Sequence, residues 1–184
     1  MLLYSQQGET TSIKQQNKLC LKDKFSSVSN TTKTTGVPAR SVIWVKYPTT
    51  QPFSDNDWES VKKDSKLAIQ RWINAEMAKR SCIVVLIGST TSTRKWVKYE
   101  IEKAYELGKG IVRIYVYGLK DKDGNQTTKG ANPFFNILTD DGHRLSNYVT
   151  AYDTNYVTSK YVYDDIEEHI SDLIEEAIAN AGKY

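Results

Sequence analysis

The chain has 184 residues, of which 39% are hydrophobic and 11% aromatic, and its formal net charge is +3. This length is typical of a single domain with a sizeable core. Residues 1–50 carry seven basic and two acidic side chains, whereas residues 51–184 carry 18 and 20, so the globular part has no basic footprint for nucleic acid. The opening "MLLY" is too short for a signal peptide, and no apolar run reaches the length of a membrane span.

The chain contains two cysteines, Cys20 and Cys82, and two histidines. Cys82 lies in the apolar run "CIVVLI", so we expect a buried thiol rather than a disulfide framework. This cysteine usage fits the reducing cytoplasm. No cysteines have the paired spacing of a zinc site, so we expect no metal.

The composition of the chain changes near residue 51. Residues 1–41 show no sustained helical or strand period and include "NTTKTTG", which is typical of a disordered segment. "SVIWVKY", residues 41–47, has the β-branched and aromatic content of a strand. We therefore predict an atypical, poorly ordered N-terminal segment over residues 1–51 and a folded domain over residues 52–184.

Residues 56–79 are predicted to form a helix. Asn56 is a good N-cap, and Glu59 follows it at the capping-box spacing. The apolar side chains of this segment share one broad face, as expected of a helix that packs on a core. They are Trp58, Val61, Ala68, Ile69, Trp72, Ile73 and Met77.

Two strands are predicted next, with a helix between them. "CIVVLI", residues 82–87, is a continuous apolar run, the pattern of a strand that is covered on both faces. "IVRIYVY", residues 111–117, is the second strand. Residues 95–107 have apolar side chains at helical spacing, and Gly108 follows them as a cap.

After the turn "KDKDGN", we predict a long irregular connection over residues 126–160 and an amphipathic helix over residues 164–181. The alternation of helices and strands predicts an α/β, doubly wound fold with a parallel sheet and helices on both faces. Ligands of such folds bind outside the carboxyl ends of the strands. Those ends lie in "GSTTSTR", residues 88–94, and after Tyr117.

Trp96 and Glu100 are four residues apart, so they share a face near the start of the predicted helix. A carboxylate there would face the crevice, and an indole beside it can stack on a flat ligand ring. Ser89 and Thr90 offer hydroxyls and N–H groups that suit a phosphate at a helix entry. Spacing alone favours a plainer interpretation, with Trp96 in the core and Glu100 in water beside Lys103.

The stretch from residue 81 to residue 134, "SCIVVLIGSTTSTRKWVKYEIEKAYELGKGIVRIYVYGLKDKDGNQTTKGANPF", resembles the TIR-like family that includes the sensor protein of Thoeris antiphage defence. "SDNDWESVKKDSKLAIQRWINAEM" resembles the preceding helix of the same family. The resemblance runs from about Pro52 to Phe134. It combines the W-x-x-x-E helix, the V-L-I-G-S strand end, the D-x-x-G-N turn and the G-x-N-P-F segment in that order.

This resemblance implies a flavodoxin-like fold and cleavage of the nicotinamide–ribose bond of NAD, with Glu100 as the catalytic carboxylate. NAD would be the substrate, so no cofactor is implied, and Trp96, Ser89 and Thr90 would bind it. Sensors of this family are thought to cyclise the ADP-ribose part into a signal, so the implied partners are NAD or a related nucleotide and a Thoeris effector. A phage protein as trigger and a homo-oligomer stay open, and neither nucleic acid nor membrane is expected.

The family's first central strand, resembling "VFFSF", and its next helix, resembling "WRASQVRNMG", are absent from residues 1–51. Codons for residues 24–50 are compatible with both words when each codon starts one nucleotide earlier. We interpret residues from about 19 to 50 as an out-of-frame translation of the domain's own first strand and helix. The alternative is a lineage-specific N-terminal extension. With the first central strand missing or replaced, we expect a chain that is less stable than its family and impaired as an enzyme.

Two other functional interpretations remain. One is a non-catalytic TIR-like module that binds a nucleotide or a protein, including an inactive frame-shifted copy. The other is an unrelated flavodoxin-like response module. The second is disfavoured because no acidic cluster follows a recognisable first strand.

Overall fold

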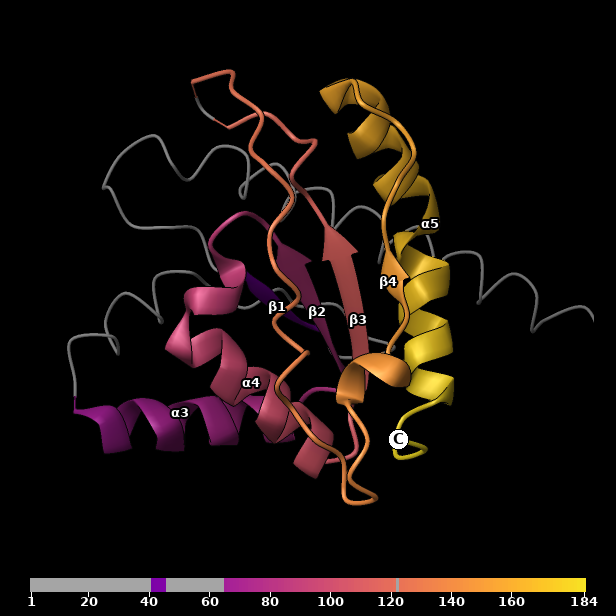
Figure 1. Ribbon diagram of the computed structural model, residues 1–184. Coiled ribbons are helices and arrows are strands. Elements are labelled where there is room, and N and C mark those ends of the chain that lie inside the picture. Colours follow the sequence, from indigo (N-terminus) through magenta and orange to yellow (C-terminus); the bar gives the residue numbers. More distant parts are fainter. Residues whose placement is uncertain (1–40, 46–64, 122) are drawn as a thin grey trace, which may run out of the picture.

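The computed structural model describes residues 41–45, 65–121 and 123–184 (Figure 1). Its elements in chain order are β1 (Val42–Val45), α3 (Lys66–Ala78), β2 (Cys82–Ile87), η2 (Thr91–Thr93), α4 (Lys95–Glu106), β3 (Gly110–Tyr115), η3 (Leu145–Asn147), β4 (Ala151–Tyr152) and α5 (Ser159–Ala179).

The described strands form one sheet in the order β1-β2-β3-β4. β2 and β3 are parallel, with Ile83 opposite Ile111, and β3 and β4 are also parallel. The α/β expectation with parallel central strands is therefore confirmed. β1 differs, because it pairs antiparallel with β2 and places Val42 opposite Val85. The two-residue β4 lies in the segment expected to be irregular, since so short a strand leaves no period in the sequence.

Both faces of the sheet are covered, as the apolar run of β2 predicts. All six residues of β2 are buried. Ile83, Val85 and Ile87 pack with α3, α4 and the segment 134–149 on one face, and the alternating residues of β2 pack with α5 on the other. Figure 1 shows the same layers, with α3 and α4 on one side of the strands and α5 on the other.

α3 begins at Lys66, and Ser65 is its N-cap. Ser65 has an extended backbone, and its hydroxyl accepts a hydrogen bond from the amide of Ala68 at 3.3 Å. The predicted helix over residues 56–79 is therefore not continuous across Ser65, and its expected cap at Asn56 lies outside the described residues. The expected apolar face is confirmed for Ile69, Ile73 and Met77, which are all buried.

The other two helices follow their predicted patterns with shifted ends. α4 ends at Glu106, and Gly108 has the left-handed φ of 57° that suits a residue after a helix. α5 begins at Ser159, five residues before the predicted start, because the apolar Val162 in its first turn is also buried. Its buried stripe continues through Ile166, Ile170 and Ile174, as expected.

β1 lies inside the segment that the sequence assigned to an atypical N-terminal region. Val42 packs in the core on the α3 and α4 side, and Val45 packs in the core on the α5 side. Residues 42–45 are therefore built into the sheet, as a strand next to β2. The predicted boundary between residues 51 and 52 lies outside the described residues and stays a prediction.

Candidate functional site

The loop after β2 is folded around Thr91. The Thr91 hydroxyl donates to the carbonyl of Leu86 at 3.0 Å and accepts from the amide of Gly88 at 3.0 Å. Thr91 is only 2% exposed, whereas Ser89 and Thr90 are exposed at the tip of the loop. Sequence reasoning chose the two exposed hydroxyls and missed the buried one that shapes their backbone.

Arg94 joins this loop to the start of β1. Its Nη1 donates to the hydroxyl of Ser41 at 2.8 Å, and the carbonyl of Ser41 accepts from the amide of Leu86 at 2.7 Å. Burial lowers the pKa of the Arg94 guanidinium. No sequence pattern could indicate this contact, because Ser41 lies more than 50 residues before Arg94.

Ser89 and Thr90 do not lie at the N-terminus of α4 as expected from the sequence. The short helix η2 follows them, and Arg94 occupies the N-cap position of α4 without a side-chain capping bond. Their hydroxyls are nevertheless accessible at the carboxyl edge of β2. Their assignment to substrate binding stays a prediction.

Glu100 lies in the buried stripe of α4 and is only 2% exposed. The other buried residues of this wholly described helix are the apolar Val97, Ile101 and Ala104. The plainer interpretation of Glu100 as a solvated partner of Lys103 is therefore wrong, and Lys103 pairs instead with Glu106 at 2.7 Å. Withdrawing a carboxylate from water is costly, so such a position is typical of a functional or paired group.

Trp96 is half-buried one turn before Glu100 and packs against the same core. Its ring is perpendicular to that of Tyr99, with the ring centres 6.0 Å apart, and the ammonium of Lys95 lies 4.6 Å from the centre of the Trp96 ring. The Tyr99 hydroxyl donates to Asn74 at 2.8 Å, which ties α4 to α3. A stacked ligand would have to use the ring face that Lys95 leaves open, or displace Lys95.

The segment "GANPFF", residues 130–135, crosses the carboxyl end of β2. A Cβ at Gly130 would lie only 2.0 Å from the carbonyl oxygen of Gly88, so the two backbones are in direct contact. Phe134 is fully buried in the core, but Phe135 is 52% exposed beneath the guanidinium of Arg144 at 3.6 Å. The start of this segment therefore lies directly against the loop that carries Ser89.

A buried arginine on β3, Arg113, contacts the same segment through the ring of Phe134. Arg113 is 9% exposed on β3, and its guanidinium carbon lies 5.5 Å from the ring centre of Phe134. Its Nη2 donates to the carbonyl of Ser146 at 3.2 Å, and burial lowers its pKa. Sequence reasoning missed Arg113; its only signal is a charged residue inside an apolar strand.

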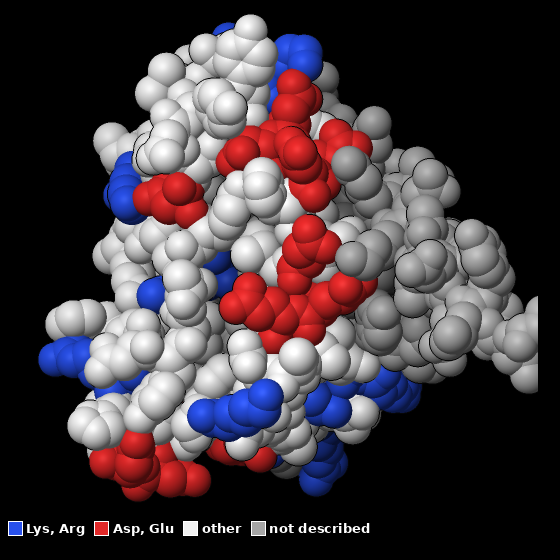
Figure 2. Space-filling view, turned by 90° about the vertical axis from the view of Figure 1, so that its right-hand side faces the viewer, with Lys and Arg blue, Asp and Glu red and all other residues white. Residues whose placement is uncertain are grey.

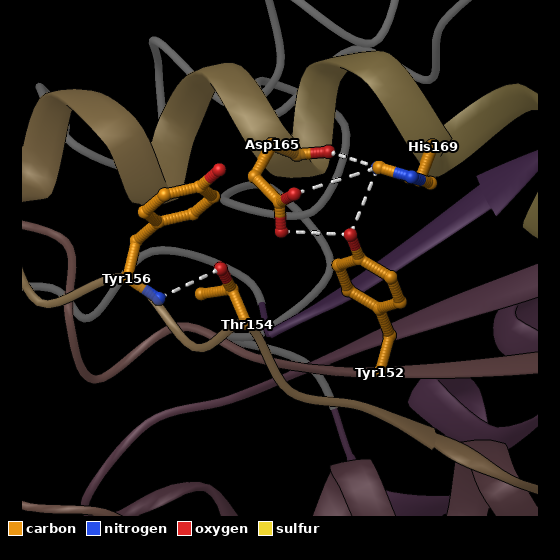
Figure 3. A network of polar contacts seen from close by, with 5 residues as sticks. All are labelled: Tyr152, Thr154, Tyr156, Asp165 and His169. Carbon is orange, nitrogen blue, oxygen red and sulfur yellow. Dashed lines mark hydrogen bonds and ion pairs between the residues drawn. The ribbon is translucent and has the colours of Figure 1, made fainter.

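A polar network joins β4 to α5 (Figure 3). The Tyr152 hydroxyl donates to the carboxylate of Asp165 at 2.7 Å and lies 2.9 Å from Nδ1 of His169. That nitrogen is also 2.8 Å from the carbonyl of Asp165. Burial and the neighbouring Asp165 raise the pKa of Tyr152, because both disfavour the phenolate. This network fixes the strand end that leads into residues 153–157.

Replacing Tyr152 with Phe removes the bond to Asp165 and keeps the ring. We expect the free energy of unfolding to fall by about 1 kcal/mol, the typical value of one such hydrogen bond. Urea unfolding measures this loss. Tyr161→Phe is the control, because Tyr161 is 55% exposed on α5, the helix that carries Asp165. An equal loss in both variants would contradict the role of the network.

The outer face of α5 is acidic (Figure 2). Asp164, Glu168, Asp172 and Glu176 follow one another at a spacing of four residues and are all exposed. Such a stripe repels phosphate groups and gives no footprint for nucleic acid. Within the described ranges, no helix combines the length and the apolar character that a bilayer crossing requires.

Parallel central strands with helices on both faces define an α/β protein of the flavodoxin-like class. Residues 39–121 match the model of the family described as Thoeris protein ThsB, TIR-like domain, and this match includes β1 and the whole of α4. Over these residues the chain is similar to the Thoeris TIR-like family.

A protein of Bacillus cereus (strain MSX-D12), named "Putative cyclic ADP-D-ribose synthase ThsB1", is similar to this chain. The two are 42% identical over 99 residues, which make up 52% of this chain and 52% of that protein. The chain therefore matches its curated relative over about half of the length of each.

Proposed function

We propose that this protein cleaves the nicotinamide–ribose bond of NAD and converts the ADP-ribose part into a cyclic ADP-ribose-type signal. The observation that carries the proposal is the burial of Glu100, the one carboxyl group in the otherwise apolar buried stripe of α4. The name of the 42% identical relative, a cyclic ADP-D-ribose synthase, supports it.

The chemistry suits a buried carboxylate. When the bond from ribose C1 to the nicotinamide nitrogen breaks, the electron pair leaves with nicotinamide, and positive charge develops on C1 and the ring oxygen. An anion held nearby stabilises this charge, and it does so more strongly where water is excluded. A nucleophilic atom of the ADP-ribose part then bonds to C1 and closes the ring.

The other residues take supporting roles in this proposal. Trp96 shapes the site beside Glu100, and the exposed hydroxyls of Ser89 and Thr90 bind the phosphates. NAD enters as substrate rather than as a resident cofactor. The same proposal places the protein in the cytoplasm and includes a Thoeris effector that receives the product. It also includes a phage protein as trigger and self-association of the chain.

One observation favours a second candidate function, that of a non-catalytic module that binds a nucleotide or a protein. The strand beside β2 is β1, which runs antiparallel to β2, whereas the other strands that pair in this sheet are parallel. A replaced strand would change the groups that this edge of the sheet presents to a substrate.

The full chain incubated with NAD distinguishes the two functions. We expect free nicotinamide and a cyclised product in chromatography and mass spectrometry, both lost in Glu100→Gln. Equal background in the two proteins would reject enzymatic activity for the chain as it stands and favour the binding module, particularly if NAD still binds to the unsubstituted chain.

A further inference from the structure

A cavity of about 460 Å³ lies at the carboxyl ends of β3 and β4, away from α4. Three segments form its walls: residues 117–118 after β3, residues 126–127, and residues 153–157 between β4 and α5. Its size falls in the range of about 300–1,000 Å³ that is usual for small-molecule sites. Figure 3 shows Tyr156 and Thr154 of its wall beside the network of Tyr152.

Hydrogen bonds across the walls hold the cavity open in one shape. The side-chain amide of Gln126 donates to the carbonyl of Val157 at 2.7 Å and also to the carbonyl of Gly118, so one side chain joins all three segments. The amide of Thr127 donates to the carbonyl of Tyr117 at 3.2 Å. A preformed site loses little freedom when a ligand binds, which favours affinity.

The walls combine aromatic rings with hydrogen-bonding groups. Tyr117 and Tyr156 come from different walls, and Asp153 and Asn155 supply a carboxylate and an amide. Oδ2 of Asp153 accepts from the ammonium of Lys129, whereas Oδ1 is buried and has no hydrogen-bond partner among the described residues. Because Oδ1 is shielded from solvent, the accessible part of this 26% exposed carboxylate is Oδ2, and a carboxylate oxygen can accept a second hydrogen bond from a ligand that brings a donor.

These features narrow the class of ligand. Lys129 neutralises the carboxylate of Asp153, so a cationic ligand has no advantage here. Two tyrosine rings favour a ligand with a flat face, and the carboxylate and amide favour one with hydroxyl groups. A purine nucleoside combines both parts, since its base stacks on an aromatic ring and its ribose hydroxyls donate to a carboxylate at a strand end.

We propose that this cavity binds the nucleoside part of a nucleotide, with the base against Tyr117 or Tyr156 and the ribose near Asp153. This site is additional to the proposed catalytic site and does not use Glu100. The protein would therefore hold a nucleotide in a second place, at the outer end of the sheet.

Calorimetric titration of the full chain with adenosine tests this proposal. We expect saturable binding that weakens about tenfold or more in Tyr156→Leu, the order of magnitude for the loss of one stacked ring. Tyr161→Leu is a matched control: both tyrosines are 55% exposed, and their rings contact each other at 5.9 Å. Either substitution removes that contact, but only Tyr156→Leu takes a ring from the cavity wall.

A second variant guards against a change in folding. Asn155 is exposed on the wall, so Asn155→Ala should also weaken binding and leave the thermal midpoint unchanged. Absence of saturable binding at millimolar adenosine would overturn the proposal. So would equal affinity in Tyr156→Leu and Tyr161→Leu, or binding of glucose as tight as that of adenosine, which would indicate a sugar site.

Glu100→Gln separates this inference from the proposed function. We expect this variant to bind adenosine as the unsubstituted chain does, even though its nicotinamide release falls by a factor of about 10²–10³. Loss of adenosine binding in Glu100→Gln, with binding retained in Tyr156→Leu, would place the nucleoside at the catalytic site and reject the second site. If the unsubstituted chain binds adenosine but shows no NAD turnover, the cavity would be supported and the enzyme rejected.

Discussion

Glu100→Gln is expected to lower the rate of nicotinamide release by a factor of about 10²–10³, the loss typical when one preorganised electrostatic group is removed from an active site. Glutamine has nearly the same size as glutamate but carries no charge to stabilise the developing cation. The measurement is the initial rate of nicotinamide formation at saturating NAD, followed by chromatography.

Glu102→Gln is the matched control for this prediction. Glu102 lies two residues further along α4, and its side chain is 41% exposed. Its Oε1 lies 3.6 Å from Nζ of Lys98. The same chemical change on the outer side of the helix should leave the rate unchanged. Similar losses in both variants would indicate a general effect of charge on α4 and would remove Glu100 from the catalytic role.

The thermal midpoint of each variant is needed beside the rate. A buried carboxyl group can also serve stability through its partners, and its replacement would then unfold the protein. The rates and thermal midpoints of Glu100→Gln and Glu102→Gln should therefore be compared in two backgrounds. One is the chain as it stands, and the other is a chain whose residues 19–50 carry the shifted-frame sequence. Turnover only in the second version, lost again with Glu100→Gln, would show that the N-terminal segment and not Glu100 limits the present chain.

Gly130→Ala is expected to have the largest effect on stability among alanine substitutions of the loop glycines that the structure describes. The added methyl group would lie 2.0 Å from the carbonyl oxygen of Gly88 and 2.8 Å from its carbonyl carbon. Both atoms belong to the backbone at the end of β2, so the clash cannot be relieved by a side-chain rotation. We expect the free energy of unfolding to fall by about 1–3 kcal/mol, the usual cost of overpacking, with a thermal midpoint lower by several degrees.

Gly88→Ala is the matched control, because it adds the same methyl group to the other glycine of this contact. A Cβ on Gly88 would meet only the hydroxyl of Thr91, at an ordinary distance of 3.9 Å, so little change in stability is expected. Calorimetric unfolding of both variants measures the difference. If Gly130→Ala unfolds at the same temperature as Gly88→Ala, segment 130–135 is not in close contact with the loop after β2.

Gly130→Ala should also affect the proposed activity. The segment can relieve the clash only by moving away from residues 88–89, which would shift the loop that carries Ser89 and Thr90. We therefore expect nicotinamide release to fall in Gly130→Ala even at a temperature where the protein remains folded.

Much of the fold could be predicted from the sequence because its signals are local. The β-branched run of residues 82–87 predicted a strand covered on both faces, and the apolar spacing of Ile69, Ile73 and Met77 predicted the buried side of α3. The end of α4 before Gly108 also followed from one residue type. Element starts were less accurate, as at Ser65, where a serine hydroxyl that accepts a hydrogen bond from the amide of Ala68 caps the start of α3, although the apolar pattern alone predicted a continuous helix.

The candidate site was less accessible to the same reasoning. Sequence spacing placed Trp96 and Glu100 on one helical face, but it favoured a solvated Glu100, because spacing does not tell which side of a helix meets the core when its neighbours are polar. The exposed Ser89 and Thr90 were chosen over the buried Thr91, because the three neighbouring hydroxyls are chemically alike and only burial distinguishes them.

By itself, the sequence determined the class of fold, the order of the main helices and strands from Lys66 onward, and the likeness to the Thoeris TIR-like family. These follow from periodicity and from motifs that are continuous in the chain. Only the tertiary structure decided that Glu100 is buried, that Gly130 lies against Gly88, and that β1 pairs antiparallel with β2. Each of these depends on contacts between segments far apart in the chain, where burial and steric fit select one arrangement among several that the local pattern allows.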